Sequence, residues 1–264
     1  MKEATYIHGT TPDEQDRLAT LNRLSNPPFI AFLDIKSGDN VLEIGSGLGI
    51  LATDVSIATG ASVTGLEISH DQLAIAQRLD SSVEWVQGDA HRLPFADETF
   101  DVVYSRYLLE HVADPLQVMR EAHRVLKPSG RFYNQENNNA VQHLWPECPA
   151  YDHAWKVFEQ LQADLGGDAL IGKKLYAMAY DAGFADIQIS LQPEMHGFNE
   201  PGYTIWMKNL IALLMGAKSH IISDKYLSEK QFNDAVADLE AMMANPRGSV
   251  YFYWNRVAAR KKAG

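Results

Sequence analysis

The segment that most constrains the fold of this 264-residue chain is residues 41–49, which read VLEIGSGLG. A short apolar run ends at Gly45, Gly47 and Gly49, and a helix-like segment follows at once. A buried strand that leads through glycines into a helix brings backbone N–H groups and the positive helix end close to a ligand. Glycines allow this approach because they carry no Cβ. The segment therefore predicts a nucleotide-binding turn in an α/β fold.

Strand-like and helix-like segments alternate from residue 39 onward. The predicted strands are residues 39–44, 62–67, 83–87, 100–105, 130–135, 186–191 and a last, aromatic-rich strand at 249–258. Alternation of this kind predicts a doubly wound parallel sheet with right-handed crossovers. A long helical stretch before the last strand is a plausible lid over a site. We therefore divide the chain into an N-terminal helical arm or lid (1–38), an α/β core (39–192), a helical lid insertion (193–247) and a last strand that completes the core (248–264).

Composition excludes several classes of function. The chain has 23 basic and 34 acidic residues, a formal charge of −11, which argues against a surface that follows nucleic-acid phosphates. The single cysteine, Cys148, allows no internal disulfide or cysteine-rich zinc site and fits a reducing cytoplasm. No segment approaches the roughly 20 apolar residues that span a bilayer. We expect a cytoplasmic protein with no nucleic-acid partner, no membrane span and no metal site.

The residues around the glycines discriminate between nucleotide ligands. A dinucleotide-binding turn would place its last glycine one position later, where Ile50 stands. Glu43, just before the glycines, would repel a pyrophosphate. It suits a ligand that brings a positive amino group and no phosphate. S-adenosylmethionine has these properties, so the turn favours this ligand over a nicotinamide dinucleotide.

Further polar residues follow the next strands of the predicted sheet, where ligands bind in such folds. Glu67 ends the second strand, and its carboxylate can accept both ribose hydroxyls, each bond contributing roughly 1.5–3 kcal/mol. Asp89 can accept from an adenine amino group while the Ala90 N–H donates to the ring. The backbone of Ser105 and Arg106 can bind the amino group of the ligand. Capping of nearby backbone N–H groups remains an alternative role for Glu67 and Asp89, and for Glu43.

Five segments together resemble the class I S-adenosylmethionine-dependent methyltransferases, of the type with which bacteria methylate small metabolites. They are residues 41–49, 65–69, 87–90, 100–103 with 110–112, and 126–130. The resemblance implies a Rossmann-like seven-stranded sheet whose last strand is antiparallel. It also implies S-adenosylmethionine as cofactor, S-adenosylhomocysteine as product, and SN2 displacement of the methyl group by O, N or C of a small organic acceptor. The cofactor-binding residues that we predict are Glu43, Gly45, Ser46, Gly47, Gly49, Glu67, Ile68, Asp89, Ala90, Ser105 and Arg106.

A general base is needed only if the acceptor holds its proton at neutral pH. His111 is a candidate because it lies one turn after Tyr107 near the predicted site, although it can equally pack behind the loop. Tyr6 and His8, on the N-terminal arm, are further catalytic candidates, and His143 is a fourth. No His, Asp or Glu set has a spacing typical of metal ligands.

Three other functions remain open at this level. A nicotinamide-dependent oxidoreductase has a similar sheet, a catalytically silent partner protein would bind the same cofactor, and an enzyme of this fold could use the sulfonium for cyclisation or decarboxylation. The aromatic residues of the predicted lid favour an acceptor with apolar area, such as a quinone precursor or a secondary metabolite. A homo-oligomer is compatible with the sequence.

Overall fold

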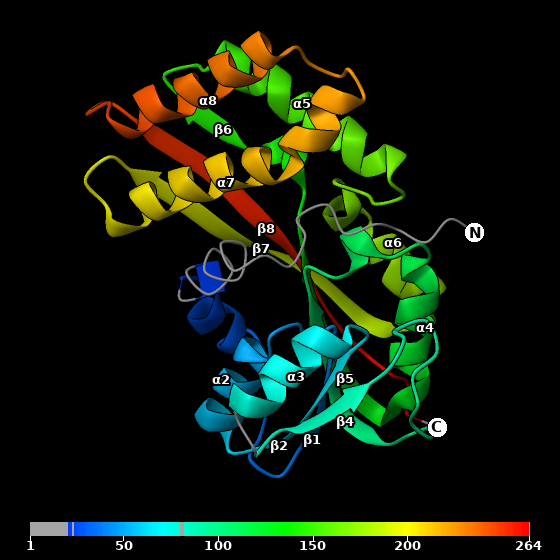
Figure 1. Ribbon diagram of the computed structural model, residues 1–264. Coiled ribbons are helices and arrows are strands. Elements are labelled where there is room, and N and C mark those ends of the chain that lie inside the picture. The colour runs from blue at the N-terminus through cyan, green and yellow to red at the C-terminus, as the bar shows by residue number, and fades with distance from the viewer. Residues whose placement is uncertain (1–20, 23, 80–81, 264) are drawn as a thin grey trace.

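The fold is built on one mixed sheet, seen in a computed structural model that describes residues 21–22, 24–79 and 82–263 (Figure 1). The strands are β1 (Asn40–Ile44), β2 (Ser62–Glu67), β3 (Glu84–Gln87), β4 (Phe100–Arg106), β5 (Leu126–Glu136), β6 (His143–Trp145), β7 (Ala185–Gly197) and β8 (Ser249–Arg260). Strands β3, β2, β1, β4 and β5 are parallel neighbours in that order. Strand β8 runs antiparallel between β5 and β7. The predicted doubly wound, Rossmann-like sheet with an antiparallel last strand is therefore confirmed.

Strand β5 begins at Leu126, four residues before its predicted start, and the sheet differs from the sequence prediction in two further places. Strand β7 continues to Gly197 because it pairs with β8 along its whole length, to Ser249. Strand β8 extends beyond the end of β5, and the free part of its edge pairs with the short strand β6. The described sheet thus contains an eighth strand in addition to the seven that we expected.

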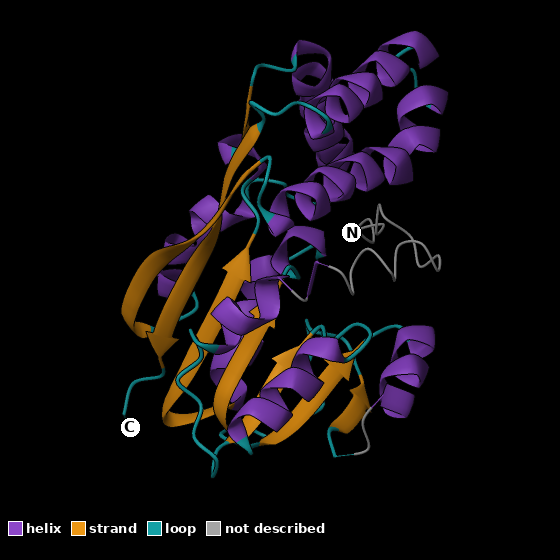
Figure 2. Ribbon diagram, turned by 90° about the vertical axis from the view of Figure 1, so that its left-hand side faces the viewer, coloured by secondary structure: helices purple, strands orange, loops and turns teal. Residues whose placement is uncertain are grey.

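The helices form two groups. Helices α2 (Ile50–Thr59), α3 (His70–Leu79), α4 (Pro115–Val125) and α6 (Leu175–Asp181) accompany the parallel strands, with 3-10 turns η1 (Leu109–His111), η2 (Asn139–Val141) and η3 (Ile171–Lys174). Helices α5 (Pro149–Asp164), α7 (Pro201–Ser223) and α8 (Glu229–Met243) gather at the far ends of β7 and β8 (Figure 1). We call this second group the helical layer. In the view turned by 90°, the long strands rise past the parallel sheet, and the helical layer lies on one side of them (Figure 2).

Local sequence signals explain where several of these helices begin. Helix α4 has Pro115 in its first turn, and the Asp114 side chain accepts a hydrogen bond from the Gln117 N–H. Helix α8 begins with a reciprocal capping box between Ser228 and Gln231. These caps satisfy N–H groups that have no partner inside the helix.

Three hydrophobic clusters hold the described residues together. One packs α2 against β1 and β4, and a second packs α4 and α6 against the opposite face of the sheet. The third joins α5, α7 and α8 to the far end of β8 and contains the fully buried Trp206 and Phe232. Helix α5, which falls within the range 39–192 assigned to the core, therefore packs with the helical layer.

Only the end of the N-terminal arm is described, where residues 24–30 are helical. Tyr6 and His8 lie outside the described residues, so their predicted roles stay predictions.

Candidate active site

A cavity of about 1020 Å³ lies between the carboxyl ends of the parallel strands and the helical layer. Its lower wall comes from the turns after β1, β2, β3 and β4, and its upper wall comes from α5, α7 and β8. The strand order reverses between β1 and β4, so the cavity opens at the switch point where ligands bind in such folds. All the predicted cofactor-binding residues line it except Gly49 and Ser105.

The glycines of the turn after β1 have different roles. All three have positive φ, between 54° at Gly47 and 79° at Gly49. A Cβ on Gly47 would meet only Gln72 Oε1, at 3.3 Å, so this position faces the cavity. A Cβ on Gly49 would lie 2.4 Å from the Trp85 ring and 2.8 Å from Ala76 Cβ. Gly49 therefore allows α2 to pack closely on its neighbours, whereas Gly47 leaves room for a ligand.

Ser105 is buried behind the cavity wall. Its Oγ accepts a hydrogen bond of 2.9 Å from Asn134 Nδ2, which joins β4 to β5. The Ser105 side chain therefore makes a hydrogen bond between two strands. At this end of β4, Arg106 and not Ser105 lines the cavity.

Glu67 joins the turn after β1 to the turn after β2. Its Oε2 accepts a hydrogen bond from the Gly47 N–H at 2.9 Å, and its Oε1 accepts one from the Ser69 N–H at 2.8 Å. The capping role that the sequence left open is therefore present. The same carboxylate lines the cavity and holds the glycine turn against the end of β2.

Glu43 is 3% exposed, and burial raises the pKa of its carboxyl to about 8, against the opposing charge of Arg106. No described residue bonds Glu43 Oε2. A buried oxygen without a donor, beside a glycine turn, fits a ligand that carries a positive charge. The residues present therefore fit a sulfonium nucleoside with an amino group.

Asp89 is held in place by its own loop. Burial raises the pKa of Asp89, but hydrogen bonds from the backbone and the ring of His91 outweigh this effect and lower it. The carboxylate is therefore charged, and it lines the cavity beside Ala90.

Arg106 connects the helical end of the N-terminal arm to the end of β4. We call this part, residues 21–22 and 24–30, the N-terminal helix. Its guanidinium donates hydrogen bonds to Asn22 Oδ1 at 2.7 Å, Asn26 Oδ1 at 2.6 Å and Ser25 Oγ at 3.2 Å. It also lies 5.2 Å from the centre of the Phe29 ring. The sequence predicted only a backbone role for Arg106, because these partners are about 80 residues away and no local pattern indicates them.

Aromatic residues form the opposite half of the cavity, which sequence reasoning located only in part. Trp155 and Phe158 of α5 are stacked with ring centres 5.1 Å apart, and Tyr107 packs on Trp254 at 4.4 Å. We call this part the aromatic half. Its polar groups include the amides of Asn137, Gln162 and Asn209. A helical period of aromatic residues over 149–164 was the signal that could have located α5.

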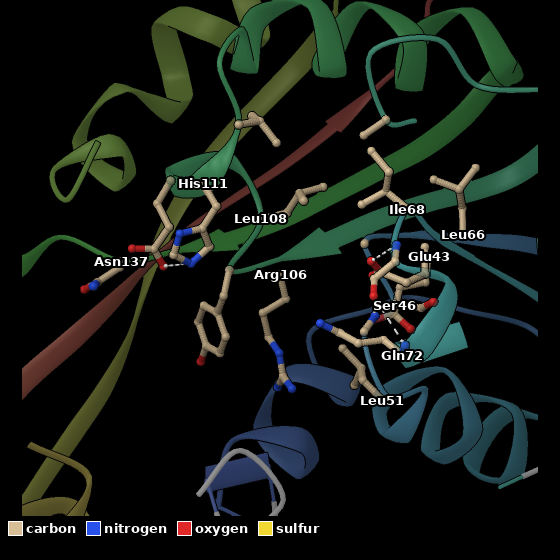
Figure 3. A pocket seen from close by; sticks show the side chains of 18 of the residues that line it. Glu43, Ser46, Leu51, Leu66, Ile68, Gln72, Arg106, Leu108, His111 and Asn137 are labelled. Carbon is tan, nitrogen blue, oxygen red and sulfur yellow. Dashed lines mark hydrogen bonds and ion pairs between the residues drawn. The ribbon is translucent and has the colours of Figure 1, made fainter. Parts of the chain in front are cut away.

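His111 lines the cavity, and Figure 3 shows it near Asn137, across Arg106 from Glu43 and Ser46. Its Nε2 lies 3.8 Å from Glu110 Oε1. His143 is exposed on β6 and does not line the cavity.

Comparisons with known proteins agree with this geometry. A sequence family described as "Methyltransferase domain" matches residues 42–134. The 2-phytyl-1,4-beta-naphthoquinone methyltransferase of Arabidopsis thaliana chloroplasts is 35% identical over 179 residues, which cover 59% of this chain and 68% of that protein. The chain belongs to the S-adenosylmethionine-dependent methyltransferases. The predicted class I family and its cofactor, S-adenosylmethionine, are thereby confirmed.

Two further comparisons match parts of other methyltransferases, one in sequence and one in fold alone. The ubiquinone biosynthesis O-methyltransferase of Pseudomonas syringae is 39% identical over 129 residues, which cover 46% of this chain and 55% of that protein, so the match spans about half of its length. The phosphoethanolamine N-methyltransferase 2 of Haemonchus contortus, solved with S-adenosylmethionine, shares the fold with a TM-score of 0.54 at 22% identity, over 94% of this chain and 52% of that chain.

Among the helices that the structure describes, none has the length and apolarity needed to cross a membrane. The cytoplasmic location, the absence of a nucleic-acid partner and the homo-oligomer stay predictions.

Proposed function

We propose that this methyltransferase transfers a methyl group to a hydroxyl group of a small, neutral, aromatic metabolite of quinone-like chemistry. The observation that carries the proposal is the division of one cavity into two halves. One half, which we call the acidic half, lies at the glycine turn and is lined by Glu43, Glu67 and Asp89. The other is the aromatic half under the helical layer. Ligand cavities commonly enclose about 300–1,000 Å³. A cavity of about 1020 Å³ therefore offers room for a cofactor and an acceptor side by side.

The acidic half would hold the cofactor. The Gly47 backbone faces the cavity, Glu67 would accept the ribose hydroxyls, and Asp89 with the Ala90 N–H would bind the adenine. Glu43 would face the positive charge. When bound, S-adenosylmethionine supplies an activated methyl group on a sulfonium. The protein residues then contribute mainly alignment of the two reactants, which can lower a barrier by ~7–11 kcal/mol.

The aromatic half would hold the acceptor. Its rings and neutral amides favour a flat, uncharged molecule with a few oxygen atoms. Among the described lining residues, Arg106 is the one guanidinium or ammonium group, and Asn22, Ser25 and Asn26 already accept its hydrogen bonds. Among the described lining residues, a phosphate or carboxylate on the acceptor would therefore find no further guanidinium or ammonium group to pair with.

The names of two relatives support this class of acceptor. One relative is named for a naphthoquinone and the other for O-methylation in ubiquinone biosynthesis. The transfer to oxygen rests on the second name and on the acid–base groups beside the aromatic half.

The proposal is tested in two steps. First, calorimetry with S-adenosylhomocysteine measures cofactor binding. Second, the protein is incubated with methyl-labelled S-adenosylmethionine and either dihydroxynaphthalenes and catechols or their phosphorylated counterparts. We expect label in the neutral compounds, with the mass of one added methyl group, and little in the phosphorylated ones. Binding without transfer to any neutral compound would contradict the proposal and favour a silent partner protein, and a product that lacks the methyl mass would favour cyclisation or decarboxylation.

A further inference from the structure

Besides Glu43, Glu67 and Asp89, a further acid lines the cavity close to the end of β4. Glu110 belongs to η1, lines the cavity and is 7% exposed. Hydrogen bonds to β5 hold the turn that carries it. The buried Glu136 Oε1 accepts one from the Leu108 N–H at 3.1 Å and one from the Leu109 N–H at 3.0 Å. Strand β4 adjoins β1, so this turn lies beside the glycine turn. Glu110 is therefore held at the boundary between the acidic half and the aromatic half.

The two oxygens of the Glu110 carboxylate differ. Oε2 accepts a hydrogen bond of 3.1 Å from Gln162 Nε2, on the same helix as Trp155 and Phe158. Oε1 lies 3.8 Å from His111 Nε2, which is beyond hydrogen-bond distance. His111 therefore does not hold Oε1 in a hydrogen bond, and the Glu110 side chain lines the cavity. A carboxylate at a cavity wall that the neighbouring histidine does not bond is suited to accept a hydrogen bond from a ligand hydroxyl.

We propose that Glu110 takes the proton from the acceptor hydroxyl during methyl transfer. This assignment rests on the proposed function. The O–H bond of the acceptor breaks and its proton goes to Glu110 Oε1, while the oxygen forms a bond to the methyl carbon. The bond between that carbon and sulfur breaks, and its electron pair stays on sulfur. A carboxylate and a sulfonium are neutralised together, so the cavity keeps the same net charge and no new charge is buried.

The groups that face Glu110 are compatible with this role. His111 lies on its own turn, Gln162 faces it from α5, and Glu136 lies behind it on β5. Burial, with the nearby charge of Glu110 as the next largest cause, raises the pKa of Glu136 to about 8. At neutral pH Glu136 therefore keeps its proton and adds no second negative charge. The turn carries one carboxylate that faces the acceptor, and His111 is a positioning residue beside it.

The test compares two acceptors of different acidity. Glu110→Gln keeps the size of the side chain and its contact with Gln162 but cannot take a proton. With a catechol, whose hydroxyl is protonated at the assay pH, we expect the rate of transfer to fall by about 100-fold or more. With a nitro-substituted phenol that is already ionised, we expect a loss of less than about tenfold. S-adenosylhomocysteine should bind as tightly as to the wild type, since Glu110 is not assigned to the cofactor.

A matched control is available in Glu194→Gln. Glu194 is also a buried glutamate beside a histidine, His196, but it lies on β7 and outside the cavity lining. We expect nearly wild-type transfer in this variant. Glu110→Asp should recover part of the activity with the catechol. It keeps a carboxylate at this position, on a side chain that is one methylene group shorter than that of glutamate.

The possible failures are distinct. Equal losses with both phenols, or no loss in Glu110→Gln, would overturn the assignment of Glu110. A larger loss in His111→Asn than in Glu110→Gln would overturn it in favour of the histidine. If the wild type binds S-adenosylhomocysteine but methylates neither phenol, the proposed function fails and the assignment of Glu110 fails with it.

Discussion

Single acidic residues determine much of the chemistry that this cavity can support. Glu67 already bonds two backbone N–H groups of the turns that would bind the cofactor, while Glu43 carries an oxygen that no described residue bonds. The first acid is preorganised by the fold, and the second has its pKa raised by burial. Each difference leads to a measurable effect of substitution.

Glu67→Ala is expected to weaken binding of S-adenosylhomocysteine by about 2 kcal/mol, because charged hydrogen bonds to the ribose and the support of Gly47 are lost together. Calorimetry measures the change in Kd. Glu84→Ala is the control: Glu84, on the neighbouring β3, accepts one hydrogen bond from Thr64 and lies outside the cavity lining. An unchanged Kd in Glu67→Ala would contradict the ribose assignment.

Glu43 should make the stability of the ligand-free protein depend on pH. Its pKa is raised from 4.5 to about 8, so the folded state holds the proton more tightly than the unfolded state. This contribution to the free energy of unfolding is complete below about pH 4.5 and is lost as the pH rises towards 8. Glu43→Gln cannot ionise. We therefore expect its Tm to exceed that of the wild type near pH 8, with a smaller difference near pH 5.

Scanning calorimetry at several pH values measures this difference. The exposed Glu84→Gln serves as its control and should show no such trend. A constant difference between Glu43→Gln and the wild type at all pH values would show that Glu43 does not titrate in this range.

At the scale of elements, the turn from β1 to α2 combines two tasks that one motif encodes. Gly47 leaves space at the cavity, and Gly49 allows α2 to approach Trp85 and Ala76. The sequence pattern presents the two glycines as equivalent. They differ because their neighbours come from other elements, α3 and β3, whose positions the motif does not contain.

Gly47→Ala and Gly49→Ala should therefore separate binding from stability. Both place a Cβ at positive φ, which costs about 1–2 kcal/mol in each variant. Gly49→Ala adds an overlap with the Trp85 ring, so its Tm should fall further than that of Gly47→Ala. Gly47→Ala should instead bind S-adenosylhomocysteine more weakly by about tenfold or more, since its Cβ faces the cavity. Equal stability and equal affinity in the two variants would contradict the division of roles.

The elements themselves were largely predictable. The strands β1 to β5 have short apolar runs bounded by glycine, proline and polar residues, and these local signals gave their positions to within a few residues apart from the early start of β5. The length of β7 and the presence of β6 were not predictable, because both depend on pairing with β8, more than 50 residues further along the chain. Pairing between distant segments leaves no local period to recognise.

For the whole molecule, the decisive feature is that two separately packed units enclose one cavity. The parallel sheet carries the acidic half, and the helical layer, with its own hydrophobic cluster, carries the aromatic half. Contacts such as Glu110 to Gln162 join the two units across the cavity. The affinity for the cofactor and the affinity for the acceptor should therefore respond to different substitutions.

Trp155→Leu tests this separation. Loss of the stacked ring should raise KM for a catechol by about tenfold, which corresponds to roughly 1.4 kcal/mol of acceptor binding. The Kd for S-adenosylhomocysteine should not change. Trp145→Leu is the matched control, since Trp145 is 61% exposed on β6 and outside the cavity lining. Parallel losses of both affinities in Trp155→Leu would indicate that the layer supports the whole site.

The sequence by itself determined the order of the parallel strands, the glycine turn, and the acids at or just after the ends of β1, β2 and β3. It could do so because caps, turns and hydrophobic periods are set by residues close together in the chain. Only the tertiary structure decided that Arg106 bonds the N-terminal helix, that Gly49 lets α2 pack closely, that the Ser105 side chain bonds Asn134, and that Glu110 lines the cavity. Those properties depend on burial and on contacts between residues tens of positions apart, which packing creates and no local pattern records.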